Sequence, residues 1–340
     1  MNLIERATSK LKERLTSRGL ILMYHRVAEP DLDPWGLRVS PKHFAEQLAV
    51  INRFFHPLSM QELIKHMQRG KVPNRSIVVT FDDGYVDNLL HAKPLLEHYD
   101  VPATIFLVTD ALVEESNFWW DELEWALLQP GTLPASLKLN VNGSKHEWQL
   151  GDARQYSIQE REKDWRRRPW DALSGTRLAF FYLIWQQLLK LSKPERLEAL
   201  DAIRAWVGTG SNPRRGDHAL SQEDVRALGN GKLVELGAHT ITHASLRLLS
   251  NSQQMDEIAG SKAQLENIIG RPVTSFSYPH GEYSVETTDL VKKAGFQVAS
   301  TTNFRCVLPN ADPFQLPRFQ VDDWSGEEFL RRLVRWYALS

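Results

Sequence analysis

The stretch that decides the fold is SIVVTFDDG, residues 76–84, in which an apolar run ends in two carboxylates and a glycine. The β-branched residues of this run are typical of a strand buried on both faces, as in a parallel sheet. In α/β folds, side chains at the carboxyl ends of such strands form the reaction site. Because successive side chains of a strand point in different directions, Asp82 and Asp83 need not have the same role. One carboxylate can bind a metal ion while the other accepts a proton from water.

A second strand-like run, VELGA at residues 234–238, leads into two histidines four residues apart, His239 and His243. Two imidazoles at this spacing can converge on one cation, and a carboxylate from the first stretch supplies a third ligand. Two histidines and one acid, with positions left for water, compose a catalytic zinc-type site rather than a closed structural one. Either motif alone is weak evidence for a metal site, because Asp-Asp-Gly is common in turns and paired histidines often arise by chance. Together they predict one divalent ion, with Zn²⁺ expected and Co²⁺, Ni²⁺ or Mn²⁺ as alternatives.

The motif Thr-Phe-Asp-Asp-Gly followed by His-Thr-Ile-Thr-His resembles the signature of the polysaccharide deacetylases, carbohydrate esterase family four, also called the NodB-homology fold. The resemblance covers roughly residues 20–110 and 215–325. It implies that Asp82 is the general base and that Asp83 and the two histidines hold the metal. It also implies a distorted (β/α) barrel whose site lies at the carboxyl ends of the strands.

The third motif of this family departs from its ordinary form. Ordinary members carry Arg-x-x-Pro followed by Trp or Tyr, and the arginine steadies the catalytic aspartate. Here residues 276–281 read FSYPHG, without arginine, which resembles the poly-N-acetylglucosamine deacetylases. The resemblance implies that the backbone N–H of His280 helps to bind the oxyanion, and we expect its imidazole on the substrate side. Arg318 can supply the missing charge by pairing with the catalytic aspartate, and a surface salt bridge is the equal alternative.

The general acid of ordinary family members comes from a strand near the carboxyl terminus that ends in Leu-x-x-His. No such motif follows Trp324, but LMYHRV at residues 22–27 is an equivalent near the amino terminus. The poly-N-acetylglucosamine enzymes resemble a circular permutation of the family in which this strand is moved. The resemblance therefore implies that His25 is the acid, and a histidine titrates in the range that this role needs.

Composition is that of a large globular enzyme. Of 340 residues, 42% are hydrophobic and 24% charged, enough to bury the core of one large α/β domain or two smaller ones. The formal net charge of −1 implies no global attraction to nucleic acid, which we do not expect as a partner. The single Cys306 excludes an internal disulfide and fits a reducing compartment.

Residues 1–19 are expected to form an N-terminal helix with apolar residues at helical spacing and arginines and lysines between them. Neither a secretory signal nor an apolar run long enough to cross a bilayer is evident. We therefore expect a cytoplasmic protein. Packing of this helix on the outside of the domain is the favoured interpretation; contact with a membrane surface, at its inner face, is the alternative.

Strand-like and helical runs alternate over residues 20–110 and 219–340, which predicts parallel strands joined by crossover helices. The predicted fold class is α/β, a distorted (β/α) barrel of the NodB-homology type. Residues 111–218 break the alternation and are predicted to form a largely helical insertion. Trp119 and Trp120 near its start are candidates for stacking on sugar rings, although they cannot both point inward from one helix face. Packing of the insertion onto the barrel is the favoured interpretation for most of its aromatic residues.

The predicted function is metal-dependent hydrolysis of an N-acetyl group on an amino sugar of a polysaccharide or glycan precursor. An N-acetylated glycan or a lipid- or nucleotide-linked sugar is the expected substrate partner. One alternative is deacylation or deformylation of a non-polymeric amide. Another, of a different class, is a non-catalytic glycan-binding module, and the retained base, metal ligands and acid argue against it.

Overall fold

The computed structural model describes residues 17–29, 32–114, 117–141, 143–165, 167–208 and 218–338. The helix predicted over residues 1–19 lies outside the described residues except at its last three positions. The chain divides into two compact units: the larger contains residues 1–29, 37–114 and 220–340, and the smaller contains residues 30–36 and 115–219. The smaller unit thus includes residues 30–36, which the sequence pattern did not connect with the insertion.

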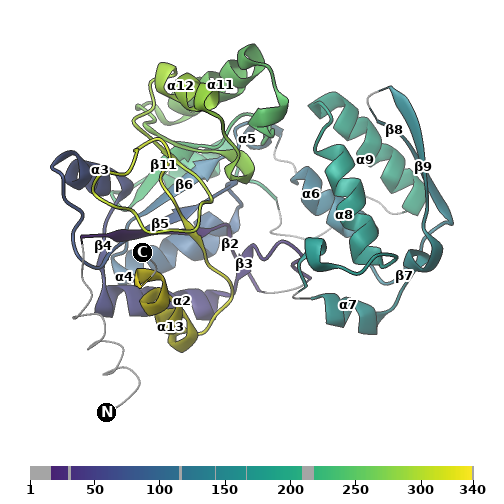
Figure 1. Cartoon of the computed structure of the whole chain (residues 1–340), viewed down its shortest axis with the longest axis horizontal. Helices are drawn as coiled ribbons and strands as arrows, with labels where there is room; N and C mark the ends of the chain where they lie inside the picture. Colours follow the sequence, from purple (N-terminus) through teal and green to yellow (C-terminus); the bar gives the residue numbers. More distant parts are fainter. Residues whose placement is uncertain are drawn as a thin grey trace. The chain divides into compact units, whose positions relative to one another are not determined.

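The larger unit is built around one parallel sheet (Figure 1). Seven strands lie in the order β13 (Val298–Ser300), β12 (Ser275–Ser277), β11 (Val234–Ala238), β6 (Ala103–Leu107), β5 (Ser76–Phe81), β1 (Gly19–Tyr24) and β14 (Phe319–Gln320). An eighth, β4 (His56–Pro57), pairs with β5 off this path. The sheet curls until its two edges approach, because Ser300 of β13 bridges Leu316 just before β14. The predicted distorted barrel is confirmed.

The strands β1 and β5 are neighbours in the barrel wall. All six residues of each are buried, as expected for strands covered on both faces. They pair in parallel register, Leu22 opposite Val79 and Tyr24 opposite Phe81. The first strand of the chain therefore ends level with the strand that carries the two aspartates, so residues that follow β1 emerge at the same edge as Asp82.

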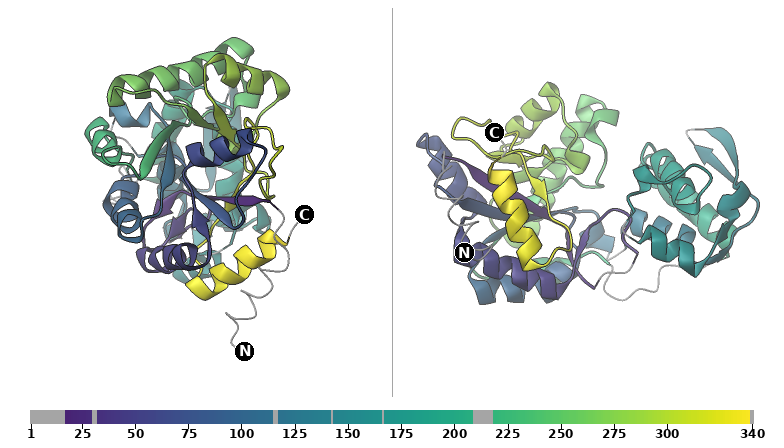
Figure 2. Two further views of the ribbon diagram at one scale, coloured as in Figure 1. Left: turned by 90° about the vertical axis from the view of Figure 1, so that its left-hand side faces the viewer. Right: turned by 60° about the horizontal axis from the view of Figure 1, so that its bottom comes forward.

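Helices surround the sheet (Figures 1 and 2). Serines begin most of them. The helices are α2 (Pro41–Phe54), α3 (Met60–Gln68), α4 (Lys93–Tyr99), α5 (Ala111–Glu114), α10 (Gln222–Leu228), α11 (Asn251–Ile269), α12 (Val285–Lys293) and α13 (Gly326–Tyr337). Ser40 caps α2, with Pro41 at the first position, and Ser221 forms a capping box with Asp224, both as predicted. A π-helical turn, Asn88–Ala92, precedes α4. No helix among the described residues has the length and apolar composition needed to span a bilayer.

The smaller unit mixes helices with antiparallel strands. Its helices are α6 (Trp119–Leu127), α7 (Ile158–Asp164), α8 (Arg177–Leu188) and α9 (Lys193–Val207). A hairpin of β8 (Ser136–Val141) and β9 (Ser144–Gln149) and a short pair, β7 (Gly131–Thr132) with β10 (Gln155–Tyr156), complete it. The prediction of a largely helical insertion was incomplete. The hairpin has a sequence signal, because residues of β8 alternate between buried and exposed and the dipeptide Asn142-Gly143 follows.

Candidate active site

A tight turn at the end of β5 separates the two aspartates. The strand ends at Phe81, and the Asp82 N–H donates to the Tyr24 carbonyl at 3.0 Å, which extends the pairing with β1. Asp83 then adopts a left-handed conformation with φ 73°, and Gly84 follows at φ 89°. The two carboxylates diverge because the backbone turns and not because side chains alternate along a strand, so that premise of the sequence analysis was wrong.

His239 and His243 meet Asp83 above the ends of β5 and β11. The Oδ1 atom of Asp83 lies 3.7 Å from His239 Nε2 and 3.5 Å from His243 Nε2. The three residues are buried, and one ligand atom from each lies within 4.8 Å of the others. His239 Nδ1 is 2.8 Å from the Ser277 carbonyl, so this nitrogen carries the proton and Nε2 is left as a ligand atom.

These three side chains fit a divalent metal ion. A carboxylate oxygen and two imidazole nitrogens make the donor set of a catalytic centre with open positions. Burial lowers the pKa of His239, which favours the neutral ring that binds metals. Asp83 (φ 73°), Thr240 (φ 65°) and His243 (φ 56°) all have left-handed backbones, a strain that tends to gather at functional sites.

Arg318 forms a two-pronged ion pair with Asp82. Its Nη1 and Nη2 atoms lie 2.7 Å from the two carboxylate oxygens, and the arginine is 1% exposed. The predicted pair is therefore present, and the alternative of a surface salt bridge is wrong. Burial alone would raise the pKa of Asp82, but the charge and hydrogen bonds of Arg318 hold it at about 2. Asp82 is ionised and fixed in orientation, 4.0 Å from His239 Nε2.

His25 follows β1 directly and lies in the electrostatic field of the same groups. Its backbone carbonyl accepts a hydrogen bond from Asn88 Nδ2 at 2.8 Å. Burial lowers the pKa of His25 to about 4, opposed by Asp82 and supported by Arg318 and His239. The imidazole is therefore neutral near pH 7 in the free site. This differs from the near-neutral titration expected from the sequence, because burial in the barrel outweighs the attraction of Asp82.

His280 lies beside the metal-ligand group but outside it. Its ring centroid is 4.6 Å from that of His243, at an interplanar angle of 75°. The residue has φ 58° in the short turn Pro279–Gly281 that follows β12. The structure thus brings His280 to the site, as expected from the third motif, with its side chain against a ligand ring.

Trp119 and Trp120 pack inside the smaller unit. They are 9% and 6% exposed. Trp119 stacks with Trp185 at 6.0 Å, and the Arg196 guanidinium lies 4.8 Å from its ring centre. Trp120 stacks with Phe118 at 4.6 Å. The predicted role of these tryptophans in binding sugar is not supported, because the ring surface that a sugar needs is used in packing.

Two contributors to the site escaped the sequence analysis. Ser277 contacts His239 through its carbonyl and Arg318 through its hydroxyl, at 2.8 Å in both cases. Asn88 holds the His25 carbonyl from the π-helical turn that begins shortly after the aspartates. Ser277 lies within the motif at residues 276–281, and Asn88 follows the two aspartates closely. The sequence analysis considered only the charged and histidine side chains of these motifs. π-Helical turns often occur at functional sites.

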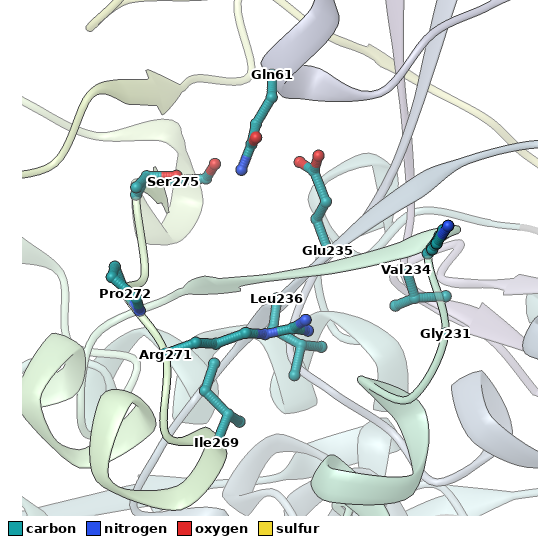
Figure 3. A pocket seen from close by; sticks show the side chains of 11 residues that line it. Gln61, Gly231, Val234, Glu235, Leu236, Ile269, Arg271, Pro272 and Ser275 are labelled. Carbon is teal, nitrogen blue, oxygen red and sulfur yellow. The ribbon is translucent and has the colours of Figure 1, made fainter.

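A cavity of about 320 Å³ lies at the opposite ends of the strands (Figure 3). It is lined by residues at the amino ends of β11 and β12, including Glu235 and Ser275, and by Gln61. The side chains of Gln61 and Glu235 point toward the same space (Figure 3). Burial raises the pKa of Glu235, while hydrogen bonds from Thr104, Ser59 and the Gln61 backbone oppose the rise. Ser59 and Gln61 lie at the start of α3. Glu235 therefore accepts hydrogen bonds from the amino-terminal end of this helix, and we assign it no chemical role.

Three known proteins are similar to this chain in sequence or in fold. YxkH of Bacillus subtilis is 22% identical over 312 residues, which span 91% of this chain and 74% of YxkH. The poly-beta-1,6-N-acetyl-D-glucosamine N-deacetylase of Staphylococcus epidermidis is 33% identical over 124 residues, 32% of this chain and 42% of that enzyme. The solved structure of IcaB from Ammonifex degensii has a TM-score of 0.57 at 16% identity, over 95% of this chain and 98% of that one, and shares the fold.

The family model described as polysaccharide deacetylase matches residues 69–149 and 199–299. These ranges contain both aspartates and both histidines of the site, and they amount to more than half of the chain. The chain belongs to the polysaccharide deacetylase family.

Proposed function

We propose that this protein removes N-acetyl groups from amino sugars of a polysaccharide by metal-dependent hydrolysis. The observation that carries the proposal is the position of Asp82: an ionised carboxylate, clamped by Arg318, lies 4.0 Å from a ligand atom of the Asp83–His239–His243 group. A base held beside a metal site is the arrangement that activates water for attack on an amide. The Staphylococcus epidermidis relative carries the name of an N-deacetylase of poly-beta-1,6-N-acetyl-D-glucosamine, which supports this substrate class.

Asp83, His239 and His243 would hold the ion. When bound, a divalent metal supplies Lewis acidity, which polarises the acetamide carbonyl and lowers the pKa of water. Asp82 needs that help, because a carboxylate whose pKa is held at about 2 is a weak base. Arg318 keeps both carboxylate oxygens in place while Asp82 accepts the proton.

His25 completes the reaction in this proposal. Amide hydrolysis expels an amine, which must gain a proton as the C–N bond breaks. His25 is neutral in the free site, where its pKa is about 4. Negative charge that develops on the substrate raises the pKa of a neighbouring imidazole, so the ring takes up a proton from solvent and passes it to the amine, while Asp82 keeps the proton of the attacking water. The backbone N–H of His280 serves as a donor to the developing oxyanion.

Acetate release tests this function. The substrates are N-acetylated oligosaccharides, including β-1,6-linked N-acetylglucosamine, lipid- and nucleotide-linked amino sugars, and simple acetamides and formamides. We expect equal amounts of acetate and free amine from a saccharide. Tight binding of a saccharide without acetate release would instead establish a glycan-binding module. Release from simple amides alone would establish the deacylation of a non-polymeric substrate.

The role of His25 predicts a loss that depends on the leaving group. His25→Ala should lower turnover of the amide roughly 10²-fold, because the amine leaves without its proton donor. Turnover of an aryl acetate, whose phenolate needs no proton to leave, should fall by less than about threefold. The measurement is kcat on both substrates with the same enzyme preparation. Equal losses on amide and ester, or none on the amide, would assign the acid to another residue, with His280 next in line.

A further inference from the structure

Ser277, on β12, contacts both a metal-ligand histidine and the ion pair between Arg318 and Asp82. Its backbone carbonyl lies 2.8 Å from His239 Nδ1. Its hydroxyl accepts a hydrogen bond from Arg318 Nη2 at 2.8 Å and donates one to Asp82 Oδ2 at 3.4 Å. The residue is fully buried on β12, which lies between β11 and β13. One strand residue therefore contacts a metal-ligand histidine and the ion pair that contains the base.

The hydroxyl also completes the hydrogen bonding of the arginine. A guanidinium has five N–H donors. In Arg318, Nε donates to the Thr301 carbonyl at 2.9 Å, and Nη1 donates to Asp82 Oδ1 and to Thr80 Oγ1 at 2.7 and 3.2 Å. Nη2 donates to Asp82 Oδ2 and to the Ser277 hydroxyl at 2.7 and 2.8 Å. All five donors have acceptors, so the guanidinium is held in one orientation.

We propose that Ser277 is a positioning residue that sets the orientation of the base relative to the metal ligands. Its hydroxyl acts on Asp82 both directly and through Arg318, while its carbonyl fixes the His239 ring. The inference rests on the function proposed above and adds to it a residue without a charged or ligating group. Removal of the hydroxyl leaves a buried guanidinium N–H without an acceptor and frees the Asp82–Arg318 pair to rotate.

Ser277→Ala tests the proposal, with kcat and KM for the saccharide amide, the thermal midpoint and metal affinity by chelator competition as readouts. We expect kcat to fall roughly tenfold, which is about 1.4 kcal/mol, with KM within about twofold of wild type. Metal affinity should stay within about twofold, because alanine keeps the carbonyl that orients His239. Ser277→Cys, which restores a weak donor and acceptor of similar size, should recover part of the loss.

Ser300→Ala is the matched control. Ser300 stands opposite Ser277 in register on β13, is equally buried, and its hydroxyl has no hydrogen-bond partner among the described residues. We expect this variant to keep kcat, which separates loss of a specific contact from loss of any buried hydroxyl in this layer. An equal loss in Ser300→Ala would overturn the proposal.

A double variant establishes the route of the effect. If Ser277 and Arg318 hold Asp82 together, the losses in Ser277→Ala and Arg318→Lys should combine to less than their product, because both variants loosen the same carboxylate. Independent, multiplying losses in folded protein would overturn the proposal, as would unchanged kcat in Ser277→Ala. Absence of acetate release from wild type on every substrate is a different result: it removes the proposed function and this role with it.

Discussion

Asp82→Asn should reduce deacetylation about 10⁴-fold, at the upper end of what loss of a general base costs. Asparagine keeps the size of the side chain but accepts no proton, and its amide nitrogen faces an Arg318 donor where a carboxylate oxygen stood at 2.7 Å. The buried guanidinium also loses its counter-charge, which costs about 3–5 kcal/mol of stability. We therefore expect a lower thermal midpoint together with the loss of turnover. Kinetics and thermal unfolding of the same preparation measure both.

Glu235→Gln is the control for this prediction. It neutralises a partly buried carboxylate of the same sheet, at the amino end of β11 rather than beyond the carboxyl end of β5. We expect Glu235→Gln to keep kcat. Retention of deacetylation by folded Asp82→Asn would show that another group takes the proton from water.

His239→Ala should remove the metal and with it the activity. Wild-type protein, purified without added metal, should contain about one equivalent of a divalent ion, most readily zinc. The variant loses one of three ligands and should contain little, with turnover at background. Elemental analysis gives the metal content, and a chelator followed by added Zn²⁺ or Co²⁺ should abolish and then restore wild-type turnover. Equal metal in both proteins would remove the central premise of the site.

His280→Ala is the informative control for metal content. The His280 ring lies 4.6 Å from the His243 ring but outside the group of three ligands. We expect His280→Ala to keep its metal while His239→Ala does not. Loss of metal in both would mean that His280 is itself a ligand, so the control also tests the composition of the group.

Local sequence motifs predicted the chemistry of the site better than its geometry. The metal-ligand group could be predicted because Asp83, His239 and His243 follow strands whose carboxyl ends meet at one edge of a parallel sheet. The left-handed turn at Asp83 could not, because its conformation depends on the tight approach of Gly84 to Leu107, where a Cβ would lie 2.5 Å from a leucine methyl. The residue pattern of a strand does not indicate at which residue its pairing with the neighbouring strand stops.

The sequence could not decide whether Arg318 pairs with Asp82 or forms a surface salt bridge, and the reason is physical. The two residues are 236 positions apart, and they meet because β14 lies beside β1 and β1 beside β5. Strand order of this kind is a tertiary property. The same holds for Trp119 and Trp120, whose apolar surface suits both a sugar ring and a protein interior. Their burial is decided by partners such as Trp185, which no local pattern specifies.

The position of β1 between β5 and β14 determines when the site can exist during synthesis. Leu22 of β1 pairs with Phe319 of β14, so the barrel wall joins a strand near the start of the described chain to a strand near its end. A ribosome-bound chain that has not yet reached Arg318 contains Asp82 and all three metal ligands, but the aspartate has no counter-charge and would prefer its neutral, protonated form when buried. The base therefore gains its counter-charge only after residue 318 has been synthesised and β14 has paired with β1.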